Sequence, residues 1–73
     1  MDREIAGEAH AAALAASRKL EQLLMDIHER ATDEDYERIR KAVALALGEI
    51  YVTVMLPLEE EFPDLEERDT DGP

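Results

Sequence analysis

Histidine titrates near neutral pH and binds metals, and the chain has two, His10 and His28. A carboxylate-bridged metal site in a helical bundle would show Glu-x-x-His on an inward face. The residues three positions before the histidines are Gly7 and Met25, so no such site is expected. We therefore assign both histidines a structural or surface role.

The sequence contains no set of residues that would support nucleophilic catalysis. The chain has no cysteine, and its single serine, Ser17, has no histidine three or four positions away to activate it. A glycine-rich phosphate loop is also missing from the sequence. The sequence therefore predicts a protein that is not an enzyme and that uses no cofactor.

The negative charge is concentrated near the C-terminus. The 73 residues carry a formal charge of −11, and residues 59–73 hold eight acids against one base, Arg68. Phosphates and anionic lipids should repel such a chain, so we expect neither nucleic acid nor a membrane as partner.

The longest apolar stretch, Ala42–Leu58, is interrupted by Gly48, Glu49, Thr53 and Pro57. A membrane span needs about 20 predominantly apolar residues, and this stretch falls short of that. The first residues are charged and do not resemble a signal peptide. The expected location is therefore the cytoplasm.

Residues 2 to about 30 read as one long helix rich in strong helix formers. Apolar positions recur at alternating steps of three and four, which predicts a seam packed against another helix. The predicted seam is Ala6, Ala9, Ala13, Ala16, Leu20, Leu23 and Ile27, widened by Ile5, Ala12, Leu24 and Ala31.

A short turn at about residues 31–33 should separate two antiparallel helices. Thr32 can cap the second helix, with Asp35 three positions on as in a capping box. This helix should run from about 33 to 56, because Pro57 disturbs the carbonyl of Thr53 and should end or kink it at Leu56. The β-branched run at residues 50–54 also suits a strand, but the chain offers it no partner strand.

The second helix is apolar most of the way round. One face is expected to pack on the first helix, with Ile27 near Tyr36 and Ala13 near Ile50. Five large apolar residues lie on its other sides, and one partner helix cannot cover them. We predict that they form an oligomer interface: Leu45, Tyr51, Val52, Met55 and Leu56. The predicted fold is all-α, with residues 1–58 forming a helical hairpin that dimerises into a four-helix bundle.

Residues 59–73 are expected to form a separate acidic tail containing Phe62 and Leu65. These two residues can close the open end of the hairpin near Ile5, or they can dock on another protein.

A non-enzymatic interaction protein, such as a dimeric scaffold, adaptor or regulatory subunit, agrees best with these features. One alternative is an acidic inhibitor or nucleic-acid mimic that occupies a basic site on another protein. In its architecture, a dimerising hairpin also resembles the small plasmid copy-number regulators that bind paired RNA loops. That resemblance implies RNA binding on a bundle face, although Arg18 and Lys19 are the only bases in the middle of the first helix.

Overall fold

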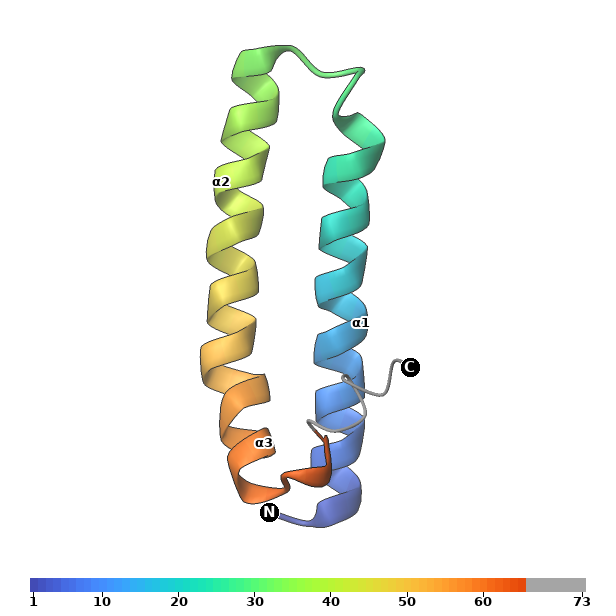
Figure 1. Ribbon diagram of the computed structural model, residues 1–73, viewed down its shortest axis with the longest axis vertical. Coiled ribbons are helices and arrows are strands. Elements are labelled where there is room, and N and C mark those ends of the chain that lie inside the picture. Colours follow the sequence, from blue (N-terminus) through green and yellow to red (C-terminus); the bar gives the residue numbers. More distant parts are fainter. Residues whose placement is uncertain (66–73) are drawn as a thin grey trace.

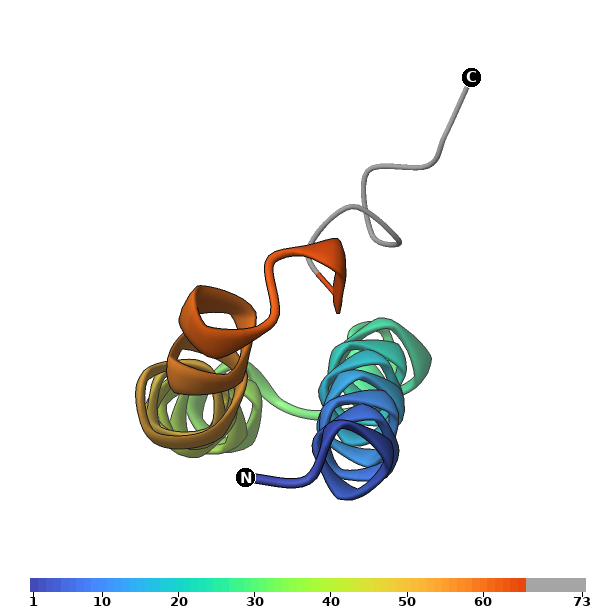
Figure 2. The same ribbon diagram turned by 90° about the horizontal axis from the view of Figure 1, so that it is seen from below.

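The computed structural model describes residues 1–65, which form an all-α antiparallel hairpin. Helix α1 (Arg3–Ile27) is one arm, and α2 (Asp33–Ile50) is the other. A π-helical turn, η1 (Tyr51–Met55), and a short helix, α3 (Leu56–Glu61), continue the second arm (Figure 1). Seen along the arms, the two helices make a single layer (Figure 2).

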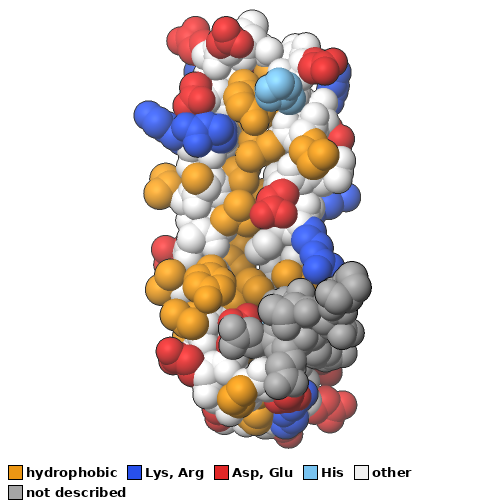
Figure 3. All heavy atoms as spheres, in the orientation of Figure 1, with side chains coloured by type: hydrophobic (Ala, Val, Ile, Leu, Met, Phe, Trp, Pro, Cys, Tyr) orange, Lys and Arg blue, Asp and Glu red, His pale blue; other side chains and the backbone are white. Residues whose placement is uncertain are grey.

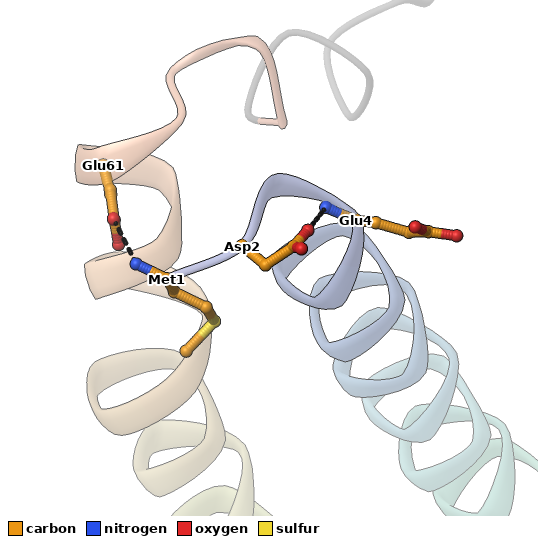
Figure 4. Close-up of polar contacts among 4 residues, drawn as sticks. All are labelled: Met1, Asp2, Glu4 and Glu61. Carbon is orange, nitrogen blue, oxygen red and sulfur yellow. Dashed lines mark hydrogen bonds and ion pairs between the residues drawn. The ribbon is translucent and has the colours of Figure 1, made fainter.

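Side-chain caps fix where both long helices begin. The Asp2 carboxylate accepts the Glu4 amide at 2.7 Å (Figure 4), and the Thr32 hydroxyl accepts the Asp35 amide at 3.1 Å. The predicted cap at Thr32 is therefore present. Helix α1 ends at Ile27, about three residues earlier than the sequence suggested, and a turn follows.

The second arm continues beyond Leu56 as α3, so of the predicted end or kink at Leu56 the end is not present. The Leu56 amide bonds to the carbonyl of Tyr51, five residues back, which widens the helix just before Pro57. Pro57 then lies in the first turn of α3, where its missing amide removes no necessary bond. Residues 59–61, assigned to the tail, are helical instead.

An exposed ion pair on α2 joins Glu37 to Arg40, three positions later. The Arg40 guanidinium donates two hydrogen bonds to Glu37, at 2.8 and 3.0 Å. These hydrogen bonds lower the pKa of the Glu37 carboxyl from its usual 4.5 and raise the pKa of Arg40.

The seam of α1 is rotated relative to the predicted one. Among the described residues, the buried or half-buried side chains along α1 include Ala6, His10, Ala13, Ser17, Leu20, Leu24 and Ile27. Ser17 and Leu24 thus take the places predicted for Ala16 and Leu23, whereas Ala9 is half-buried and packs against the core as predicted, beside the buried His10. Ala16 and Leu23 are exposed. The apolar stripe was found correctly, but its centre does not face α2.

Candidate interaction surfaces

The open end of the hairpin is closed by the C-terminal part of the described chain. Leu65 is only 1% exposed and packs in a cluster with Ala6 and Leu58. Phe62 packs against the same cluster. We call α3 together with Phe62–Leu65 the clasp, since it holds the second arm against the start of α1 (Figure 2).

A buried polar pair lies beside this cluster. His10 Nε2 and Glu59 Oε2 are 2.8 Å apart, and both side chains are buried. They are the buried polar or charged side chains among residues 1–65. Each satisfies the other, which offsets part of the cost of removing them from water.

The local sequence pattern predicts a structural or surface role for His10 but does not predict its pairing with Glu59. These residues are 49 positions apart, and Glu59 was placed in the tail. One signal was available: His10 lies four residues after Ala6 and three before Ala13, on the rim of the apolar stripe. A titratable residue at such a position needs a partner when the rim is covered.

Exposed contacts from the N-terminus also reach the clasp. The Arg3 guanidinium pairs with Asp64 and lies 5.6 Å from the centre of the Phe62 ring. The Met1 amino group is 2.9 Å from the Glu61 carboxylate (Figure 4). Since these ion-paired side chains are about half exposed, each pair contributes about 0–1 kcal/mol. Buried groups therefore carry most of the clasp's stability.

The two predicted docking residues, Phe62 and Leu65, lie in the clasp. Leu65 is inaccessible in this conformation, which agrees with the alternative in which both residues close the hairpin. The contact is with Ala6 rather than beside Ile5, which is 58% exposed. Most of the predicted acidic tail, residues 66–73, lies outside the described residues.

The five predicted interface residues do not share one surface. Leu45 on α2 is 77% exposed, and Val52, seven positions later in η1, is 58% exposed on the outer side of the same arm. Tyr51 is also exposed but, as the neighbour of Val52 in η1, it points in a different direction. Met55 is 6% exposed inside the hairpin and Leu56 is half-buried. Met55 therefore cannot serve a second chain unless the hairpin opens.

An exposed line of apolar residues runs along α1. We call it the alanine stripe: Ile5, Ala12, Ala16 and Leu23, spaced seven, four and seven positions apart. Helical spacing places it on the flank opposite Arg3 and His10, which contact the clasp. The stripe is therefore not covered by the clasp.

The turn end of the hairpin carries the aromatic contact. The edge of the His28 ring meets Tyr36, with centroids 5.2 Å apart and planes at 86°. Leu24 and Met25 complete a shallow hollow of about 310 Å³ around these rings.

On the face shown in Figure 3, hydrophobic side chains follow the junction between the two arms.

The described residues offer little for chemistry. In residues 1–65, no group of three or more His, Cys, Asp or Glu side chains could hold a metal ion.

By length and composition alone, Asp33–Glu61 is long and apolar enough to cross a membrane, a test that core helices also pass. The chain matches no family model, no curated protein and no solved structure in comparisons with known proteins.

Proposed function

We propose that this chain is a non-enzymatic helical interaction protein that pairs with a second copy into a four-helix bundle. One observation carries the proposal: large apolar side chains remain exposed around a layer only one helix thick. They include Ile5, Leu23, Met25, Leu45 and Val52. A folded protein of this size needs that apolar surface for its stability.

The core within one hairpin is small. Six hydrophobic residues among the described ones are buried, and two of them are alanines. Burying a large apolar side chain contributes about 1.5–3 kcal/mol, whereas ordering each residue costs about 1–2 kcal/mol of backbone entropy. A second hairpin laid against the first supports the fold by covering part of this exposed apolar surface.

The acidic-inhibitor alternative draws less support from the described residues. Glu59 is buried against His10, and Glu61 pairs with the Met1 amino group. Neither is presented as a free carboxylate at phosphate-like spacing. A membrane-spanning role would place Glu49 among lipid chains, which costs several kcal/mol unless the carboxylate is paired.

Sedimentation velocity and circular dichroism over a range of chain concentrations test the proposal. We expect a helical dimer of twice the 8.2 kDa chain mass at micromolar concentration, dissociating with partial loss of helix on dilution. A stable, folded monomer at that concentration overturns the proposal. So does a chain that is helical only with lipid vesicles, or one that binds RNA as a monomer.

A further inference from the structure

We propose that the second copy packs on the alanine stripe, with the two α1 helices antiparallel and crossing near residue 14. This inference rests on the proposed function and names the surface that it uses. It differs from the interface predicted from the sequence, whose exposed members Leu45, Tyr51 and Val52 lie on α2 and η1.

The stripe has the symmetry that such a contact requires. A two-fold axis makes each surface residue meet its counterpart in the other copy. Ile5 and Leu23 lie equally far from residue 14, and so do Ala12 and Ala16. An antiparallel pair of α1 helices therefore sets Ile5 opposite Leu23 of the second copy, and Ala12 opposite Ala16.

The sizes of these side chains suit a close crossing. Alanines at the centre let two helix backbones approach, and a large side chain at each end fills the space where they diverge. Beside Leu23 lies a shallow hollow of about 260 Å³, lined also by Lys19, Leu20, Gln22 and Asp26. Ile5 of the second copy can enter this hollow.

The charges at the edge of the stripe are complementary in the same register. Lys19 comes opposite Ala9 of the second copy, one position from Glu8. Each dimer therefore has two such Lys19–Glu8 approaches at its rim. Rim pairs of this kind add little affinity, but they favour one register over others.

The face of the layer that carries the stripe is large enough for a stable dimer. Helix α1 has 25 residues, which gives a length of about 37 Å at a rise of about 1.5 Å per residue. Two helices about 9 Å apart present roughly 700 Å² on one side. Stable interfaces bury about 600–1,000 Å² per partner, so this face is within the range when a second hairpin covers nearly all of it.

The test compares paired charge substitutions on two exposed surfaces. Ala12→Glu with Ala16→Glu should weaken the dimer by on the order of 100-fold, because four carboxylates would meet at the crossing. The matched control, Leu45→Glu with Val52→Glu, places the same charges on the outer side of α2 and should leave the dimer unchanged. All four positions are exposed in the hairpin, and helicity measured at high concentration reports any misfolding.

Two further samples test the register. Mixing the chain carrying Ala12→Glu and Ala16→Glu with one carrying Ala12→Lys and Ala16→Lys should restore a heterodimer, because opposite charges then face each other. Since the chain has no cysteine, Ile5→Cys mixed with Leu23→Cys should form a disulfide-linked dimer on mild oxidation, and Ile5→Cys alone should not.

The outcomes separate this inference from the proposed function. A wild-type chain that is monomeric overturns both. A wild-type dimer that resists charges on the stripe, or that is broken by Leu45→Glu with Val52→Glu, overturns the inference and leaves the proposed function standing. A disulfide formed by Ile5→Cys alone indicates parallel α1 helices and also overturns the inference.

Discussion

The two flanks of α1 differ in how far their apolar side chains are covered. On one flank, Arg3 and His10 meet the clasp, which buries Leu65 against Ala6. On the other flank, Ile5 and Leu23 are 58% and 40% exposed. The chain thus covers the first flank with its own residues, over the half nearest the termini, and leaves the second bare.

The two flanks also differ in their polar residues. A buried histidine is tolerated on the flank that the clasp covers, because Glu59 of the same chain contacts it in the folded hairpin. The bare flank carries only alanine and large aliphatic residues along its centre, which need no specific partner atom. Substitutions on the clasp should therefore change the stability of the hairpin, whereas those on the stripe should change association.

The largest expected effect comes from breaking the His10–Glu59 pair. Glu59→Ala leaves the His10 ring buried without its hydrogen-bond partner and should lower the free energy of unfolding by about 3 kcal/mol. Denaturant titration at fixed chain concentration measures this change. The control is His10→Leu combined with Glu59→Leu, which should recover most of the loss because an apolar pair needs no hydrogen bond. A loss below about 1 kcal/mol for Glu59→Ala would show that apolar contacts alone hold the clasp.

A smaller loss is expected from Leu65→Ala, which removes the most buried large side chain of the clasp. Leucine-to-alanine changes in cores cost about 2–5 kcal/mol, and the lower end applies here because the nearby chain can relax. Leu45→Ala is the matched control on the bare outer side of α2, with an expected change within about 0.5 kcal/mol. Equal losses for the two variants in thermal unfolding would mean that the clasp is open in solution.

The sequence predicts the hairpin, the Thr32 cap and the apolar stripe of α1, because these depend on local spacing. It leaves open whether the helix ends or kinks at Pro57, because the proline pattern alone does not reveal the π-helical turn upstream that lets the helix continue. The predicted seam is displaced because the apolar stripe of α1 is wider than its contact with α2, so the centre of the stripe does not mark that contact. The His10–Glu59 pair depends on the path after Pro57, which local patterns do not specify.

Gly48 offers a test of the outer side of α2, because it lies between Leu45 and Val52 on the helix. A Cβ atom added at Gly48 meets nothing within 4 Å, so Gly48→Ala should stabilise the helix by about 0.8–1 kcal/mol. The melting temperature should rise while the dimer dissociation constant stays the same. A weaker dimer would show that a second chain approaches closely at Gly48, against the stripe proposal.

The smallest expected effect concerns Glu49 on α2. It lies at about the level of residue 14 of α1, since His28 meets Tyr36 at one end of the hairpin and Ala6 meets Leu58 at the other. Helical spacing places it on the stripe side of the layer, so the proposed two-fold axis brings it near Glu49 of the second copy. Glu49→Gln removes this like-charge approach and should tighten the dimer a few-fold, corresponding to less than about 1 kcal/mol. The gain should shrink as salt is raised, because the carboxylates are exposed and screened. Sedimentation equilibrium at two salt concentrations measures both effects, and an unchanged or weaker dimer at low salt would mean that the α2 helices do not face each other.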